Sequence, residues 1–393
     1  MQNYPLPTAV PVPPPKAPNA GGAYEYGTAP PLSAYPSFSK PNALNARQIE
    51  QLKSQGFSSG LIDIVSQAKN YFPVRFWIVD NSGSMNKTDG NRLLPTKNND
   101  HVRMVQCTRW KEIQETVEYH SQMAALLQAH TTFRLLNNPG GAAGPQTFSI
   151  ADKGEDLDVI QSDLTLARNT MQQTTPSGVT PLTDHLNSIR DMLMAQAHEL
   201  RQEGKKVALI LATDGLPTNE MGIGGFEEQE RFTQAMRSFE GLPCWIVVRL
   251  CTDDDDVVEF YNNLDNQLEL SIEVLDDYTS EAKEVHKENS WLNYTLAMHR
   301  MREMGIPNRL FDLLDERRFT KSELRDFCIL LFGAGAFDGV PEPEVDWYGF
   351  MKELEVILKK EQKQWNPIKQ KAKPLLDLKE MNRLYGDASC SIM

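Results

Sequence analysis

Short apolar segments alternate with longer amphipathic ones between residue 74 and about residue 288. The apolar segments predict strands at 74–79, 131–136, 146–150, 206–212, 244–250 and 271–275. The segments between and after them predict helices at roughly 101–128, 156–173, 181–203, 226–239, 256–263 and 278–288. Near-continuous apolar strands separated by helices indicate an α/β fold with a buried, mostly parallel sheet.

One pair of predicted strands differs from the others. The strands at 131–136 and 146–150 are joined by a glycine-rich loop, 138–145, which leaves no room for a helix. Parallel neighbours need a crossover, whereas antiparallel neighbours do not. We therefore expect an antiparallel edge strand.

Outside this region the pattern is helical. Residues 45–70 predict a short helical pair, broken at Gly56 and Gly60, that is too small to fold alone and packs on the domain after it. After about residue 290, apolar faces recur at helical spacing, and Thr320 with Glu323 predicts a capping box. The predicted divisions are a tail at 1–42, a helical segment at 45–70, an α/β domain at 72–280, a helical module at 281–365 and a basic tail at 366–393.

The first 42 residues hold 11 of the 24 prolines and only three charged residues. Such a segment buries too little apolar surface to offset the entropy of ordering, so we expect a disordered tail with polyproline II character. Pro15 and Pro18 have the spacing that proline-reading modules bind. A solvated spacer is the alternative, and we favour it.

Charge and cysteine content narrow the function classes. The chain has 393 residues and a net charge of −13, which argues against a general nucleic-acid binder. We expect no membrane-spanning helix, because the apolar runs fall short of the roughly 18–20 residues that one needs. The N-terminus shows no secretory signal, and five scattered cysteines do not resemble a disulfide framework. We therefore expect an intracellular, cytoplasmic protein.

Oxygen-bearing side chains follow two of the predicted strands. Asp80, Ser82 and Ser84 come after the strand at 74–79, and Asp214 comes after the strand at 206–212. Thr180 lies in a turn before the helix predicted at 181–203. In open α/β sheets, ligands bind at the carboxyl ends of strands. Hydroxyl and carboxylate oxygens suit hard cations, so we expect Mg²⁺, or Mn²⁺ or Ca²⁺, rather than zinc.

Three motifs, in this order, resemble the von Willebrand factor type A (VWA) domain. They are Asp-x-Ser-Gly-Ser-Met at 80–85, Gly-Val-Thr-Pro-Leu at 178–182 and Ala-Thr-Asp-Gly-Leu-Pro-Thr at 212–218. The resemblance covers about residues 72–280 and implies a Rossmann-like, doubly wound, six-stranded sheet carrying a metal ion-dependent adhesion site (MIDAS).

The resemblance also implies a role for each site residue. Ser82, Ser84 and Thr180 would bind the metal directly, and Asp80 and Asp214 would hold it through water, or directly in some states. An acidic side chain of a partner protein would fill the open coordination position. Two alternatives remain: residues 80–84 could be only a helix-capping turn, and Thr183 competes with Thr180.

Two rim segments depart from a compact version of this fold. The polar stretch 86–100, with Lys87, Asp89, Arg92 and Lys97, is either a gate for partner access or a surface insertion, and we favour the insertion. The glycine-rich loop Met221–Phe226 either shapes specificity or is simply flexible.

Several enzyme motifs are incomplete. An aspartyl-phosphate phosphatase needs Asp-x-Asp, but the second position is Ser82. A serine-hydrolase elbow needs glycine where Asp80 stands, and a zinc-protease helix starting at His198 needs histidine where Gln202 stands. The sequence has no phosphate-binding Gly-x-x-x-x-Gly-Lys-[Ser/Thr] loop. We therefore expect a non-enzymatic protein.

The last four residues, 390–393, match a prenylation signal in which Cys390 would carry a farnesyl group. Between Lys359 and Lys373, six lysines against one glutamate give a charge of +5, and a basic patch supplies the second signal that stable membrane attachment needs. The alternative is a solvated tail with a chance cysteine. Prenylation would place the protein on the cytoplasmic face of a membrane.

Together these features predict an adaptor or scaffold that binds an acidic partner residue through a Mg²⁺-loaded site and is tethered to a membrane by a lipid. One alternative is a soluble regulatory scaffold with a structural metal and no lipid. A less favoured alternative is a metal-dependent hydrolase, because no general base or nucleophile accompanies the predicted ligands.

Overall fold

A six-stranded sheet forms the centre of the molecule. The computed structural model describes residues 44–95, 102–154, 156–270 and 272–386. The strand order is β5-β4-β1-β6-β7-β8, and β5 alone runs antiparallel to its neighbour, β4. This arrangement confirms the predicted mostly parallel sheet with an antiparallel edge strand. The strand bounds are β1 Arg75–Val79, β4 Thr131–Leu135, β5 Thr147–Ile150, β6 Val207–Thr213, β7 Cys244–Leu250 and β8 Ile272–Leu275.

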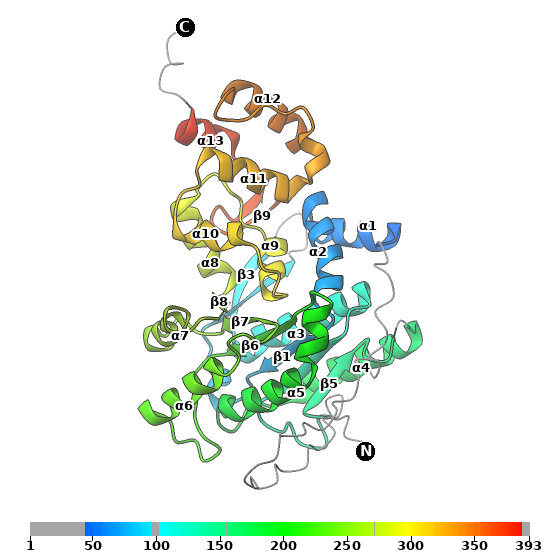
Figure 1. Cartoon of the computed structure of the whole chain (residues 1–393), viewed down its shortest axis with the longest axis vertical. Coiled ribbons are helices and arrows are strands. Elements are labelled where there is room, and N and C mark those ends of the chain that lie inside the picture. Colours follow the sequence, from blue (N-terminus) through cyan, green and yellow to red (C-terminus); the bar gives the residue numbers. More distant parts are fainter. Residues whose placement is uncertain (1–43, 96–101, 155, 271, 387–393) are drawn as a thin grey trace, which may run out of the picture.

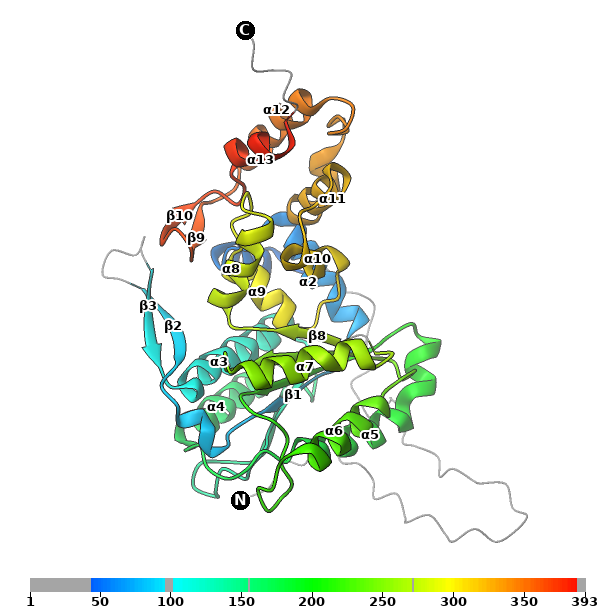
Figure 2. The same ribbon diagram turned by 90° about the vertical axis from the view of Figure 1, so that its left-hand side faces the viewer.

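Helices cover both faces of the sheet (Figures 1 and 2). Along β1, Trp77 and Val79 pack on the face that meets α3, α4 and α9, while Phe76 and Ile78 pack on the face that meets α5, α6 and α7. Burial on both faces explains why the central strands β1, β6 and β7 are largely apolar, whereas the edge strands β5 and β8 alternate between buried and half-buried residues. The helix bounds are α3 Arg109–Leu127, α4 Leu157–Gln173, α5 Leu182–Gln202, α6 Phe226–Arg237, α7 Asp255–Gln267 and α9 Leu296–Glu303.

A two-stranded ribbon occupies much of the stretch predicted as a polar insertion. A short 3₁₀ helix, η2 (Gly83–Asn86), leads to β2 (Gly90–Pro95), which pairs antiparallel with β3 (Val102–Cys107) and projects beside α3 (Figure 2). The helix predicted from residue 101 was therefore wrong at its start. The helix begins at Arg109 because the Thr108 side chain accepts a hydrogen bond from the Lys111 amide, 3.1 Å away, and caps it.

The chain continues after β8 into a mainly helical part, at the top of Figure 1. The predicted capping box of Thr320 and Glu323 is present at the start of α11. Residues 364–386, most of which were predicted to be a basic tail, form two short paired strands and a helix. The remaining bounds are α8 Tyr278–Glu288, α10 Arg309–Glu316, α11 Lys321–Phe332, η3 Ala334–Phe337, α12 Trp347–Leu358, β9 Gln364–Asn366, β10 Lys371–Lys373 and α13 Leu378–Tyr385. Among the described residues, no helix is both long and apolar enough to cross a membrane.

Three predictions fall on residues outside the described ranges. They are the proline-rich tail at 1–42, the Pro15 and Pro18 motif within it, and the prenylation signal at Cys390.

Two N-terminal helices, α1 (Ala46–Ser54) and α2 (Ser59–Tyr71), are the predicted helical pair. Gly60 lies inside α2 rather than at a break, because α2 crosses α11 there at very short range. A Cβ atom on Gly60 would lie 2.3 Å from the carbonyl oxygen of Leu330, so only glycine fits. The Ser58 hydroxyl donates a hydrogen bond to the Leu331 carbonyl at 2.5 Å. The pair therefore packs on the C-terminal helical part, and it also contacts the α/β domain, as predicted, since Gln48 donates to the Leu126 carbonyl of α3 at 2.6 Å.

Buried ion pairs join this helical part to the sheet. Glu303, at the end of α9, is fully buried and accepts hydrogen bonds from His120 on α3 at 3.0 Å and from Arg249 on β7 at 3.4 Å. Arg300 donates to the same carboxylate at 2.6 Å. Although burial opposes ionisation, Arg300 and the neighbouring histidines hold the pKa of Glu303 well below its usual range. One carboxylate thus connects α9, α3 and β7.

Replacing Glu303 with alanine is expected to lower the free energy of unfolding by about 3–5 kcal/mol, because Arg249 and Arg300 would lose a buried counter-charge. Urea denaturation of the full chain measures this change. Replacing Glu353, an exposed residue on α12, with alanine is the matched control and should change stability by less than about 0.5 kcal/mol. Equal effects of the two substitutions would contradict a structural role for the Glu303 network.

Candidate metal-binding site at the carboxyl edge of the sheet

The two aspartates predicted as ligands lie side by side. Asp80 follows β1 directly and Asp214 follows β6 directly, and these strands are parallel neighbours. The Asp80 amide extends the pairing by donating to the Ala212 carbonyl at 2.8 Å. After β1 the chain forms β4 and β5 on one side of that strand, and it then crosses to form β6, β7 and β8 on the other side. The aspartates therefore sit at the switch point where doubly wound sheets bind ligands.

Asp80 is held rigidly. Its Oδ1 accepts a hydrogen bond from the Ser82 amide at 2.8 Å, and its Oδ2 accepts one from the Thr213 hydroxyl at 2.7 Å. The side chain is fully buried. Burial, and then the nearby charge of Asp214, raise the pKa of Asp80 to about 6. A positive charge placed beside Asp80 would therefore favour its ionised form.

Hydroxyl groups connect the first motif to the second aspartate. The Ser82 and Ser84 hydroxyl oxygens are 3.0 Å apart, and the Ser84 hydroxyl donates to Asp214 Oδ1 at 2.7 Å. Three of the five predicted ligand residues thus form one hydrogen-bonded chain, and Asp80 is joined to it through the Ser82 amide.

Thr180 is brought to the same place by a separate turn. Its backbone is fixed by Thr218, whose hydroxyl accepts from the Thr180 amide at 2.9 Å and whose amide donates to the Thr180 carbonyl at 3.0 Å. A Cβ atom on Gly215 would lie 3.9 Å from the Thr180 hydroxyl, which therefore faces the turn after Asp214. The competing residue, Thr183, points elsewhere and donates to Glu228 on α6 at 3.0 Å.

The donor set fits a hard divalent cation. Asp80, Ser82, Ser84, Thr180 and Asp214 offer only oxygen atoms, from two buried carboxylates and three hydroxyls. Such groups suit Mg²⁺, Mn²⁺ or Ca²⁺ and are poor ligands for softer metals. The arrangement could therefore hold a cation at this edge of the sheet.

Arg109 also contacts the site, and sequence reasoning missed it. Its guanidinium donates to Asp214 Oδ2 at 2.9 Å and is only 4% exposed. No motif marks this residue, which is the first of α3. Its one sequence signal is a cation directly after the cap residue Thr108, in a position where helices prefer acidic residues.

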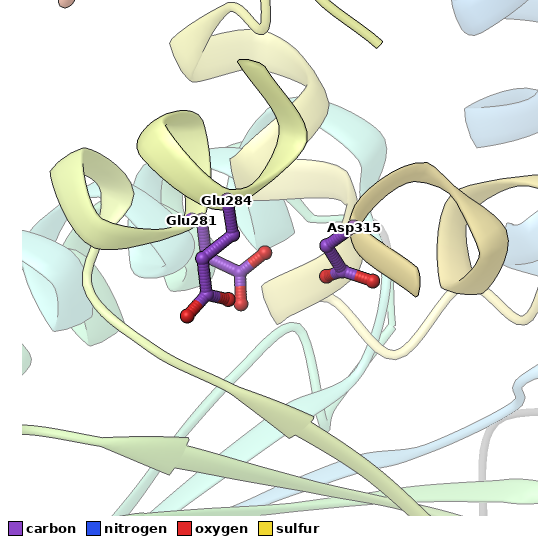
Figure 3. Close-up of side chains that lie close together, drawn as sticks. All are labelled: Glu281, Glu284 and Asp315. Carbon is purple, nitrogen blue, oxygen red and sulfur yellow. The ribbon is translucent and has the colours of Figure 1, made fainter. Parts of the chain in front are cut away.

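A second acidic group lies away from the sheet edge. Glu281 and Glu284 on α8 approach Asp315 on α10, and their carboxylate oxygens lie within 4.8 Å of one another (Figure 3). Arg302 already supplies a cation here, because it pairs with Glu281, with Asp315 at 3.6 Å and with Glu273 on β8 at 2.7 Å. The group could hold a metal ion by geometry, but Arg302 competes for the same carboxylates.

Comparison with known proteins adds little. No protein-family model and no curated protein matches this sequence. The PilB minor pilin from Streptococcus sanguinis aligns with a TM-score of 0.34 and 11% identity over 62% of each chain. A single-residue mutant of that pilin aligns with a TM-score of 0.32 and 11% identity over 52% of this chain, which spans about 57% of the mutant's length.

The SpRpn10 VWA domain aligns with a TM-score of 0.30 and 10% identity, over 52% of this chain and 88% of that domain. Similarity this low carries no argument about function. The mixed α/β architecture described above is consistent with a VWA-like fold.

The charge balance around Arg302 predicts a pH effect on stability. Burial raises the pKa of Glu273 to about 7, and Arg302, which also pairs with Glu281 and Asp315, offsets this only in part. Glu273 therefore takes up a proton on folding, and its contribution to stability is lost as pH rises from about 4.5 through 7.

Glu273→Gln cannot titrate at this position, so it does not lose this contribution as the pH rises. The difference between its free energy of unfolding and that of the native chain should therefore rise by up to about 3 kcal/mol between pH 5 and pH 8. Denaturant unfolding at both pH values measures the difference. Glu353→Gln, on an exposed helix face, should give profiles parallel to those of the native chain. Parallel profiles for Glu273→Gln as well would show that Glu273 does not change protonation on folding.

Proposed function

We propose that this protein is a non-enzymatic binding module of the VWA type, in which a divalent cation at the sheet edge engages an acidic side chain of a partner protein. The observation that supports this most strongly is the convergence of Asp80, Ser82, Ser84 and Asp214 at the ends of adjacent strands. These residues come from motifs 130 positions apart and meet in one hydrogen-bonded cluster.

In this proposal the five residues have two kinds of role. Ser82, Ser84 and Thr180 offer hydroxyl oxygens to the cation, while Asp80 and Asp214 supply the negative charge, through water or directly. A cation bound mainly by neutral hydroxyls keeps much of its positive charge, and it would attract a carboxylate of the partner. Magnesium is the favoured ion, with manganese or calcium as alternatives.

A loop at the rim of the site supports the proposal that the partner is a protein. Met221, Ile223 and Phe226 are 82%, 59% and 79% exposed, although large apolar side chains are normally buried. The Asn219 side chain orders this loop by accepting from the amides of Met221 and Ile223 at 2.9 and 3.0 Å. Gly222 lies against Val179, the neighbour of Thr180, so the loop borders the proposed site. We infer that the partner presents apolar side chains beside its acidic one.

The chemistry near the site supports binding rather than catalysis. Cys251 is a candidate nucleophile, because its thiol lies close enough to Asp80 and Asp214 for their charges to affect its pKa. Burial, however, raises that pKa to about 12. A neutral thiol is a poor nucleophile. A metal-dependent hydrolase remains the competing proposal. Turnover of generic phosphate or peptide substrates with Mg²⁺, lost in Asp80→Ala, would favour it.

Asp214→Ala is expected to weaken Mg²⁺ or Mn²⁺ binding by at least about tenfold, because one of two buried carboxylates is lost. Isothermal titration of the full chain measures the affinity, and pull-downs in Mg²⁺ or EDTA measure partner retention. Asp256→Ala, on the exposed face of α7, is the control and should behave as the native chain does. Partners retained equally in EDTA and by Asp214→Ala would refute recognition through a metal.

Phe226→Ser is expected to lower partner retention several-fold while leaving Mg²⁺ affinity unchanged, because exposed aromatic anchors contribute to protein interfaces but not to the metal. The same pull-down and titration provide both readouts. Val345→Ser, an equally exposed apolar position far along the chain, should change neither. Unchanged partner retention with Phe226→Ser would remove the rim loop from the interface.

A further inference from the structure

Arg109 lies between two aspartates of different exposure. Its Nη1 contacts Asp214 Oδ2 at 2.9 Å, while its Nε and Nη2 contact the two oxygens of Asp89 at 2.6 and 2.5 Å. The Asp214 side chain is fully buried, whereas that of Asp89 is 54% exposed. A single guanidinium therefore joins the proposed metal site to a carboxylate at the protein surface.

This contact occupies the oxygens that a cation would need. Asp214 Oδ1 accepts from the Ser84 hydroxyl, and Asp214 Oδ2 accepts from Arg109. A divalent cation at Asp214 would have to share the carboxylate with a positively charged group held a few ångströms away. Like charges repel strongly at such range in a site shielded from solvent. Arg109 and a cation are therefore expected to compete.

Asp89 is positioned to reduce that competition. It forms a bidentate pair with Arg109, the strongest geometry for this kind of contact, and the hydrogen bond from Arg109 lowers its pKa. Asp89 immediately precedes β2, and the base of that ribbon is fixed to α3. A Cβ atom on Gly90 would lie 2.9 Å from the Thr108 carbonyl oxygen, and the Asn91 amide donates to Glu112 at 2.8 Å.

We propose that Arg109 is a positioning residue that competes with the cation for Asp214, and that Asp89, carried by the β2–β3 ribbon, weakens this competition by neutralising Arg109. The ribbon thereby sets the cation affinity of the site. This inference rests on the proposed function, since it concerns the same cation.

Titration of the full chain with Mg²⁺ and with Mn²⁺ tests the inference. Arg109→Gln should bind at least about tenfold more tightly than the native chain, because the repelling charge is gone. Arg109→Lys keeps the charge and should stay near the native affinity. Asp89→Asn should bind several-fold more weakly, because the charge of Arg109 is then no longer partly neutralised by Asp89 and repels the cation more strongly. Adding Asp89→Asn to Arg109→Gln should have little further effect, because Asp89 acts through Arg109.

Arg92→Gln is the matched control. It removes a ribbon arginine that pairs with Glu115 instead, and the affinity should change by less than about twofold. Weaker binding by Arg109→Gln would show that Arg109 orients Asp214 rather than competing, and would overturn the inference. An equal loss from Asp89→Asn with and without Arg109 would also overturn it, because Asp89 would then act directly on the cation.

Two further outcomes separate this inference from the proposed function. Binding by Arg109→Gln but not by the native chain would support the inference in its strongest form. Binding by neither would refute the proposed metal site, and with it the role of Arg109. Asp89 is at the surface, so Asp89→Asn keeps the test decisive even where Arg109→Gln fails to fold.

Discussion

The parallel pairing of β1 with β6 places Asp80 and Asp214 next to each other at the sheet edge. Two buried carboxylates repel each other, so the surrounding chain has to supply hydrogen-bond donors and positive charge. The donors to Asp80 are the Ser82 amide and the Thr213 hydroxyl, and the donors to Asp214 are the Ser84 hydroxyl and Arg109. These donors come from the loop after β1, the last residue of β6 and the start of α3.

Buried charges also need partners where the C-terminal helices meet the sheet, but the numbers of acidic and basic groups differ there. At Glu303, Arg300 and the neighbouring histidines keep the buried carboxylate ionised, while Arg249 is shared with Glu112. Around Arg302 the acids outnumber the cation, and burial raises the pKa of Glu273 to about 7. Glu303 and Arg302 are neighbours in helix α9, and their two networks join this helix to α3, β7, β8 and α8. Removing one member of such a network is costly, because it leaves a buried partner without its counter-charge.

Much of the fold could be predicted because its signals are local. The central strands β1 and β6 are apolar runs that polar residues end, and the site aspartates follow these two runs directly. The helix start predicted at 101 failed because residues 102–107 suit either structure, and their pairing with residues 90–95 decides between the two. Arg109 could not be assigned to the site from sequence, because its partners, Asp89 and Asp214, are brought to it by a ribbon and a strand. The acidic group around Arg302 was missed for the same reason, since α8, α9 and α10 each contribute to it.

The tight crossing at Gly60 has a consequence for how the molecule can be divided. It fastens α2, near the start of the described chain, to α11, near its end, and both helices share one apolar core with the sheet. An excised segment of residues 72–280 would keep α3 and α4 on the face around Trp77 and Ala208 but would lose the part of its cover that α2 and α9 supply. The α/β part is thus a sheet with one face completed by helices that lie before and after it in the sequence.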